Sequence, residues 1–272
     1  SMTSTDLANK PVQLNGTSKD AADKTSKDAA AVPENKANNC DEAQQQEAEF
    51  YTDAERYWAT VEATEAGMMG GNDSLDEIEI SSSRMFLTRA AELAGLRQLN
   101  RALDCGSGIG RVTKKLLLPM FATVDMAEVT SHFLAKSREY IGEPDASRVG
   151  RQFYCGLQDL TFPAETRYDL VWVQWVIGHL RDAHLVDFLR RAAASLSPCG
   201  MIGVKDNVIT ARDDSEYDFD EQDSSVCRPR RSLLNLFNQA GLIVLLEETQ
   251  EGFPDALYPV LSFALVPKGR CV

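Results

Sequence analysis

A glycine-rich turn between a short apolar run and a helical pattern is the feature that most constrains the fold. Residues 103–111 read Leu-Asp-Cys-Gly-Ser-Gly-Ile-Gly-Arg. Residues 101–105 are typical of a buried strand, and residues 111–118 of a helix that Pro119 ends. Glycines in such a turn let the backbone approach a ligand closely, where a Cβ would clash. We therefore expect a strand–turn–helix unit that holds a nucleotide or a nucleoside.

A second short strand follows this unit and ends in a carboxylate. It covers residues 121–125, and Asp125 comes 19 residues after Gly106. A nucleotide-binding glycine turn is followed after about 20 residues by the acid that binds two ribose hydroxyls. The sequence therefore predicts that Asp125 binds a ribose. A glycine-rich turn without any ligand is the alternative.

Asp104, beside the glycines, bears on the kind of cofactor. A carboxylate there would repel a pyrophosphate and attract the ammonium and sulfonium groups of S-adenosylmethionine. The pattern Gly-x-Gly-x-Gly is also one residue tighter than the dinucleotide fingerprint. The glycine pattern is a weak signal by itself, so it is the charge of Asp104 that favours a methyl donor over NAD.

The chain after residue 100 alternates apolar runs with helical patterns. This order predicts an α/β fold with a Rossmann-like, doubly wound and mostly parallel sheet. The last two strands would form an antiparallel pair at the edge, which gives the seven strands of a methyltransferase. Strands are expected at residues 101–105, 121–125, 151–155, 169–174, 201–205, 242–246 and 258–266, and helices near residues 130–141, 182–196 and 229–240.

The N-terminal part of the chain has a different composition. Residues 1–49 contain no aromatic residue and no isoleucine, so they bury too little apolar surface to offset the entropy of ordering. We expect a disordered polar tail there, with a helical arm as the alternative. A methyltransferase domain would cover residues 50–272, with a helical lid or cap at 50–100 on a Rossmann-like core at 101–272.

Charge and cysteine content argue against several classes of function. A formal net charge of −13 opposes unaided binding to nucleic acid or to an anionic membrane, and favours a cationic partner. No apolar run approaches the ~20 residues that span a bilayer. The six cysteines include no Cys-x-x-Cys pair, so zinc and disulfide frameworks are poorly supported and a reducing compartment is expected.

Candidate binding residues follow the later strands, where sheets of this kind bind ligands. After the third strand, Leu157 and Gln158 are well placed to contact an adenine. The fourth strand ends in Gln174 and Trp175, and His179 follows closely as one of three histidines in the chain. Because His179 follows a strand end, we assign it to the site; a structural histidine is the alternative.

An acidic segment follows the fifth strand, which ends in Lys-Asp-Asn at residues 205–207. Residues 213–223 hold seven carboxylates and no basic residue. A solvated loop is the simplest interpretation of any one of them. Gathered near a methyl donor, however, they would attract a cationic amine. Trp175 would then form a wall for a flat or cationic ligand, unless it belongs to the core.

In this order, the motifs resemble those of the eukaryotic protein N-terminal methyltransferases, within the class I S-adenosylmethionine-dependent methyltransferases. Members of that group methylate the α-amino group of proteins that begin X-Pro-Lys once the initiator methionine is removed. The resemblance covers roughly residues 50–267. The segments that carry it are residues 67–71, 103–111, 155–159, 174–179, 205–207 and 223–228.

The resemblance implies S-adenosylmethionine as the cofactor and protein substrates with a basic X-Pro-Lys N-terminus. Arg111 would bind the methionine carboxylate. Asp220 would pair with the substrate lysine, although the chain departs from the family pattern just before it. Asp223 and His179 would lie at the α-amino group as catalytic residues. The implied cofactor contacts are Gly106, Arg111, Asp125, Leu157, Gln158 and Gln174, and the implied substrate contacts are Trp58, Trp175, Asn207 and Asp220.

Two other functions stay open at this point. One is a small-molecule N- or O-methyltransferase with the same cofactor site. The other is a non-catalytic adaptor that binds basic protein N-termini. We further expect a monomer in the cytoplasm, the nucleus or both, which binds neither nucleic acid nor a membrane and holds no metal ion.

Overall fold

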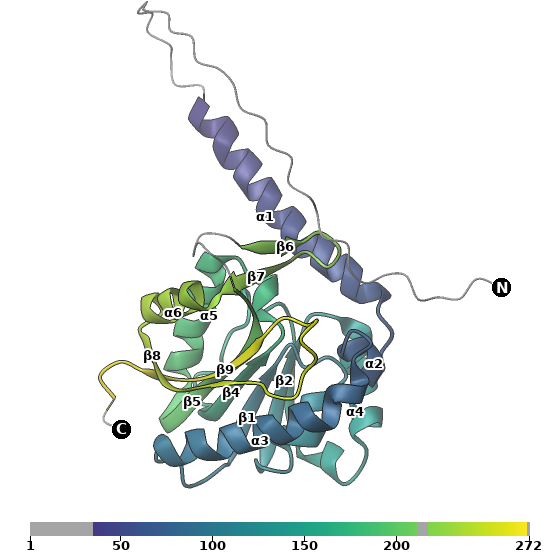
Figure 1. Ribbon diagram of the computed structural model, residues 1–272, viewed down its shortest axis with the longest axis vertical. Coiled ribbons are helices and arrows are strands. Elements are labelled where there is room, and N and C mark those ends of the chain that lie inside the picture. The colour runs from purple at the N-terminus through teal and green to yellow at the C-terminus, as the bar shows by residue number, and fades with distance from the viewer. Residues whose placement is uncertain (1–34, 211–216, 271–272) are drawn as a thin grey trace, which may run out of the picture. The chain divides into compact units, whose positions relative to one another are not determined.

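The computed structural model describes residues 35–210 and 217–270. The chain divides into two units at residue 41, and the sheet and its flanking helices belong to the second (Figure 1). The helices are α1 (Asn35–Thr60), α2 (Glu65–Met68), α3 (Asp76–Leu93), α4 (Ser131–Ile141), α5 (Asp182–Ala194) and α6 (Arg230–Gln239). The strands are β1 (Arg101–Cys105), β2 (Thr123–Glu128), β3 (Val149–Tyr154), β4 (Tyr168–Gln174), β5 (Leu196–Ile209), β6 (Asp218–Asp220), β7 (Ser225–Pro229), β8 (Leu242–Thr249) and β9 (Val260–Pro267).

The strand order confirms the predicted α/β sheet. Five strands run parallel in the order β3-β2-β1-β4-β5, and the direction of winding reverses between β1 and β4. The sheet continues with β9 antiparallel to β5 and with β8 antiparallel to β9. Ligands of such sheets bind beyond the carboxyl ends of the strands at this reversal.

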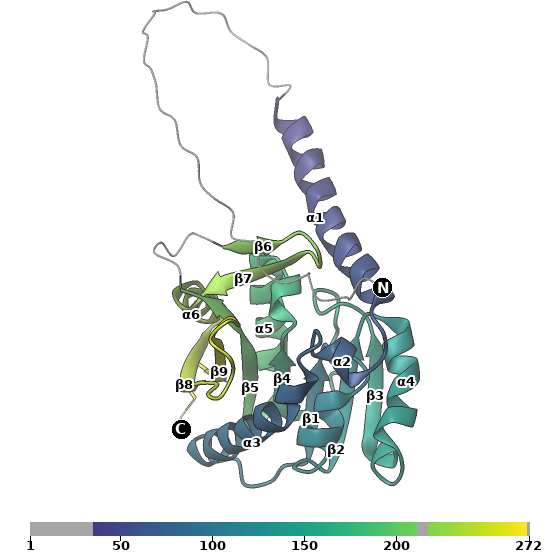
Figure 2. The same cartoon turned by 45° about the vertical axis from the view of Figure 1, so that its right-hand side comes forward.

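Helices cover both faces of the sheet (Figure 2). In β1, Leu103 belongs to a core with Phe188 of α5 and Phe237 of α6. Its neighbour Ala102 belongs to a second core with Phe86 of α3. Because both faces are covered, the central strands are mostly apolar, which is why they could be recognised as short apolar runs.

An additional hairpin makes nine strands in the described residues instead of the expected seven. β7 pairs parallel with the end of β5 at Val208 and Ile209, and β6 pairs antiparallel with β7. β6 lies within the expected acidic loop, and all of its residues are exposed. Acidic residues are depleted in strands, so the composition gave no signal for it. Residues 211–216 lie outside the described residues.

The first helix begins earlier than the boundary expected at residue 50. α1 starts at Asn35, so residues 35–49 of the expected disordered tail are helical. Their Ala, Glu and Gln content favours a helix, and Phe50 and Ala54 farther along α1 are buried. Residues 1–34 lie outside the described part of the chain. Over residues 35–210 and 217–270, no helix combines the length and the apolar character of a membrane span.

Candidate active site

Two adjoining cavities lie at the carboxyl ends of the strands. The switch-point cavity is surrounded by residues that follow β1, β2, β3 and β4, where the sheet reverses its order. The adjoining cavity lies toward β5, the β6–β7 hairpin and the start of β9. Trp58, Met68, Trp175 and His179 line both cavities, so these side chains form the boundary between them.

The glycine turn after β1 forms one wall of the switch-point cavity. Gly106 has φ +67° and Gly108 has φ +54°, in the region that favours glycine. A Cβ on Gly106 would lie 2.8 Å from the side chain of Val176, and one on Gly108 would lie 2.3 Å from the sulfur of Met68. Both positions therefore favour glycine for their conformation, and Gly106 also for its close contact with the β-branched side chain of Val176.

Asp125 does not reach the cavity, and its predicted role in binding a ribose is wrong. β2 runs three residues past it, so Asp125 lies inside the sheet, fully buried. Its carboxylate accepts hydrogen bonds from Arg101 at 2.8 and 2.9 Å and from the hydroxyl of Tyr168 at 2.8 Å. These partners fix Asp125 as a structural residue.

Glu128 takes the place that was predicted for Asp125. It is the last residue of β2 and lines the switch-point cavity. Its carboxylate accepts hydrogen bonds from the backbone N–H groups of Gly108 and Thr130, at 2.9 and 2.8 Å. The signal for it was the apolar pair Met126 and Ala127, which continues the strand beyond Asp125.

Asp104 also lies away from the cavity. It is buried beside Thr113, whose hydroxyl donates to it at 2.6 Å. Burial raises the pKa of Asp104 to about 7. Asp104 therefore does not face the cavity, and the expected attraction between its side chain and a methyl donor is wrong.

Gln158, Leu157 and Gln174 line the switch-point cavity together with Gly106 and Arg111. The side-chain oxygen of Gln174 accepts a hydrogen bond from Trp172 at 2.9 Å, which leaves its NH2 group turned to the other side. Within the described residues, this NH2 group, the hydroxyl of Ser107 and the indole N–H of Trp175 are buried without a partner. Buried polar groups without partners are rare, and all three of these belong to residues that line the switch-point cavity, where a bound ligand would satisfy them.

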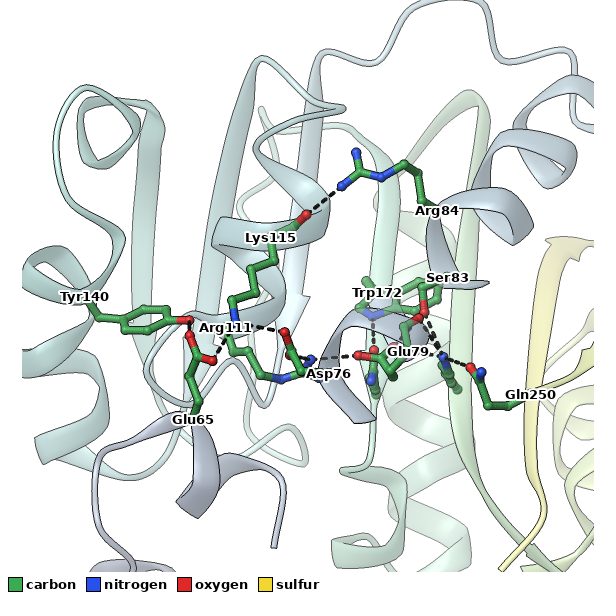
Figure 3. A network of polar contacts seen from close by, with 12 residues as sticks. Glu65, Asp76, Glu79, Ser83, Arg84, Arg111, Lys115, Tyr140, Trp172 and Gln250 are labelled. Atoms are coloured by element: carbon green, nitrogen blue, oxygen red, sulfur yellow. Dashed lines mark hydrogen bonds and ion pairs between the residues drawn. The ribbon is translucent and has the colours of Figure 1, made fainter. Parts of the chain in front are cut away.

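Arg111 enters the cavity from a buried network of ion pairs (Figure 3). Its Nη1 donates to Asp76 and to Glu79, both at 2.7 Å. Burial opposes the charge of Arg111, but Glu79 and Asp76 outweigh this effect and raise its pKa further. The guanidinium carbon lies 5.8 Å from the centre of the Trp175 ring.

Trp175 is held in a conformation that few residues other than glycine adopt. Its φ is +52°, and its backbone N–H donates to the carbonyl of Lys205 at 3.0 Å. Such strain persists only where the surrounding structure determines it, and it gathers at functional sites. Here it places the indole at the boundary of the two cavities.

His179 has a defined tautomer. Its Nε2 accepts a hydrogen bond from the indole N–H of Trp58 at 3.0 Å, so the ring proton lies on Nδ1, which is 3.4 Å from the carbonyl of Ser224. Burial lowers the pKa of His179, and the nearby charge of Asp223 opposes this shift. The imidazole is therefore neutral at pH 7.

The adjoining cavity brings together Asn207, Asp223 and His179, which come from three separate segments. One carboxylate oxygen of Asp223, Oδ1, is buried and has no hydrogen-bond partner among the described residues. Asp220 is different: it is exposed in β6, lines neither cavity, and accepts a hydrogen bond from the backbone of Gln222 at 2.8 Å. Met68 and Tyr258 also line this cavity. The sequence analysis assigned neither to the site, although Met68 lies in the segment 67–71 that carries part of the family resemblance.

Comparison with known proteins places this site in a family. A family model described as AdoMet (S-adenosylmethionine) dependent proline di-methyltransferase matches residues 46–266. An N-terminal Xaa-Pro-Lys N-methyltransferase 1 from Xenopus tropicalis is 49% identical over 221 residues, which cover 80% of this chain and 96% of that protein. The enzyme of the same name from Homo sapiens is 47% identical over 220 residues, with coverage of 80% and 96%.

A solved structure agrees with these matches. A SAM-dependent methyltransferase from Leishmania major is 36% identical, with a TM-score of 0.72, and the match covers 79% of this chain and 82% of that one. The family match extends along most of the chain and includes every residue that lines the two cavities. The chain therefore belongs to the AdoMet-dependent proline di-methyltransferase family.

Proposed function

We propose that this protein methylates the α-amino group of proteins that begin X-Pro-Lys, with S-adenosylmethionine as the methyl donor. The observation that carries the proposal is the buried, unpartnered carboxylate oxygen of Asp223, which lies beside His179 in the cavity that adjoins the switch-point cavity. An α-ammonium group is a ligand that would satisfy this oxygen. The relatives named above carry this activity in their names.

The switch-point cavity has the groups that the cofactor needs. Glu128 would accept from the ribose hydroxyls, and Leu157 and Gln158 would contact the adenine. Gly106, Arg111 and Gln174 would hold the methionine end, where the unpartnered NH2 group of Gln174 can donate to a carboxylate. When bound, S-adenosylmethionine supplies an electrophilic methyl group.

The adjoining cavity would receive the first residues of the substrate. Asn207 and Asp223 would bind the α-amino group, and the ring of Trp175 would contact the proline in second position. Asp220 lies outside the cavity on the exposed hairpin, so it would meet a lysine at the third position at the entrance. Close positioning of the amine is the main contribution that such a groove makes to the rate.

The amine must lose a proton before it can react. An α-ammonium group has a pKa of about 7.7–8.0, so most of it is charged at pH 7. Asp223 stabilises the charged form on binding, and a nearby base must then accept the proton. His179 is neutral and can accept one, provided that Trp58 releases its Nε2. That the enzyme acts as a monomer, in the cytoplasm or the nucleus, stays a prediction from the sequence.

The test of substrate class compares peptides that begin Ser-Pro-Lys and Ser-Pro-Glu. We expect kcat/KM for the second to be lower by more than about 10-fold, because like charges would meet at the acidic hairpin. Replacing exposed Asp220 by Asn should lower kcat/KM for the first peptide by up to about 5-fold, the scale of an exposed ion pair. Glu221→Gln removes the same charge one residue away and is the matched control. Equal rates on both peptides would overturn the basic-substrate assignment.

A further inference from the structure

A buried carboxylate, Glu79 of α3, lies at the centre of the ion-pair network that reaches the switch-point cavity (Figure 3). Its Oε2 accepts from Nη1 of Arg111 at 2.7 Å. Its Oε1 accepts from Nζ of Lys205 at 2.8 Å and from the hydroxyl of Ser83 at 2.7 Å. Both oxygens are therefore engaged, and the side chains of Glu79 and Lys205 are no more than 1% exposed.

The charges of this network support one another. Burial opposes ionisation of Glu79, but Lys205 and Arg111 outweigh it and lower its pKa to about 2. Glu79 is therefore a carboxylate at any pH at which the enzyme would work. Without that charge, two buried cations would lose their shared counter-charge, and Arg111 would keep only Asp76 as a charged acceptor for Nη1.

Arg111 and Lys205, the two cationic partners of Glu79, contact different parts of the site. Arg111 lines the switch-point cavity. Lys205 lies in β5, and its carbonyl accepts from the backbone N–H of Trp175 at 3.0 Å. Of these two, only Arg111 lines the cavity, because the amine of Lys205 is directed to Glu79, Ser83 and Gln250.

We propose that Glu79 is a positioning residue, which fixes the guanidinium of Arg111 so that it can bind the carboxylate at the amino-acid end of the cofactor. Arg111 donates to Glu79 and Asp76 through one nitrogen, Nη1, which sets the direction of the whole guanidinium plane. The inference rests on the proposed function only in taking Arg111 as the residue that meets that carboxylate. Its consequence is selective: Glu79 affects the amino-acid end of a ligand and leaves the nucleoside end unaffected.

The test compares two ligands by calorimetry on the full chain. S-adenosylhomocysteine carries the amino-acid end, whereas 5′-methylthioadenosine has the same nucleoside without it. In Glu79→Gln, we expect the Kd of S-adenosylhomocysteine to rise about 10-fold or more, and that of 5′-methylthioadenosine to change by less than about 2-fold. Glu77→Gln makes the same change at an exposed position of α3, and both of its Kd values should stay at the wild-type level.

A double-mutant cycle separates positioning from general loosening of the fold. If Glu79 acts through Arg111, then Glu79→Gln should have little further effect on S-adenosylhomocysteine in an Arg111→Met background. The proposal would be overturned if Glu79→Gln raised the Kd of both ligands equally. It would also be overturned if Glu79→Gln raised the Kd of S-adenosylhomocysteine as much in the Arg111→Met background as in the wild type.

If Glu79→Gln does not fold, a second variant, Asp76→Asn, allows the same measurement. Asp76→Asn removes the negative charge of the other acceptor of Nη1, on a side chain that is 14% exposed. In this variant the Kd of S-adenosylhomocysteine should again rise more than that of 5′-methylthioadenosine, but by a smaller factor than in Glu79→Gln. Equal changes in the two Kd values would count against the proposal. These measurements need no peptide, so a wild-type protein that binds S-adenosylhomocysteine but methylates no X-Pro-Lys peptide would contradict the proposed function alone.

Discussion

The indole N–H of Trp58 donates a hydrogen bond to Nε2 of His179, and the two nitrogens lie 3.0 Å apart. The lone pair that a general base would use is therefore occupied by a side chain of α1. A hydrogen bond to the neutral imidazole stabilises that form, in addition to the effect of burial. Entry of a substrate must shift Trp58 before His179 can accept a proton.

This contact predicts opposite shifts of the pKa of His179 in two variants. Trp58→Phe removes the donor to Nε2, so the pKa of His179 should rise. Asp223→Asn removes the charge that favours the imidazolium, so the pKa should fall. An NMR titration of the His179 ring measures both. Shifts of the same sign in the two variants would contradict the arrangement.

The roles of Asp223 and His179 in removing the proton are tested by turnover. Asp223→Asn and His179→Asn should each lower kcat by about 10²-fold or more, the scale of a lost general base. Steady-state rates with a saturating Ser-Pro-Lys peptide measure this. Near-normal kcat in both variants would mean that the proton leaves directly to water.

The exchange of roles between Asp125 and Glu128 predicts two distinct defects. Glu128→Gln should weaken the binding of 5′-methylthioadenosine, because Glu128 lines the cavity, and Asp125→Asn should leave that binding nearly unchanged in the folded protein. Asp125→Asn should lower the free energy of unfolding by about 1.5–3 kcal/mol, because it accepts from buried and charged donors. Calorimetry and urea denaturation separate the two. The assignment of Glu128, and not Asp125, to the ribose would be contradicted if Glu128→Gln still bound 5′-methylthioadenosine tightly while a folded Asp125→Asn did not.

The raised pKa of Asp104 predicts a dependence of stability on pH. Asp104 keeps its proton in the folded protein up to about pH 7, whereas in the unfolded chain it loses it near its ordinary value of about 3.9. Its contribution to stability therefore falls as the pH rises through this interval, and it is constant above it.

Urea denaturation of wild type and Asp104→Asn at several pH values measures that contribution. The unfolding free energy of wild type minus that of the variant should fall by up to about 1.4 kcal/mol per pH unit between about pH 4.5 and 6.5. The same difference for Asp187→Asn, at an exposed position, is the control and should be flat. A rising difference for Asp104 would contradict the assigned direction.

Much of the fold follows from short-range patterns. The parallel strands are buried on both faces, so their apolar runs stand out in the sequence, and the glycines mark the turn after β1. Strand ends are harder to predict, because a strand can continue through a charged residue that has partners from elsewhere. Asp125 is such a residue, since Arg101 and Tyr168 satisfy it inside the sheet.

Long-range contacts account for the remaining differences. Glu79 meets Arg111 and Lys205 across 32 and 126 residues of chain, and no local pattern indicates either contact. β6 forms on exposed acidic residues because β7 offers it a free edge. The family resemblance, by contrast, selected Asn207, Asp223 and His179, which the structure brings together in one cavity.

The most direct test of α-amino methylation is mass spectrometry of two peptides after incubation with the enzyme and S-adenosylmethionine. Both begin Ser-Pro-Lys, and one has an acetylated α-amine. We expect methyl groups on the N-terminal nitrogen of the free peptide and none on the acetylated one. Equal labelling of the two peptides would place the methyl group on the lysine side chain and contradict the proposed function.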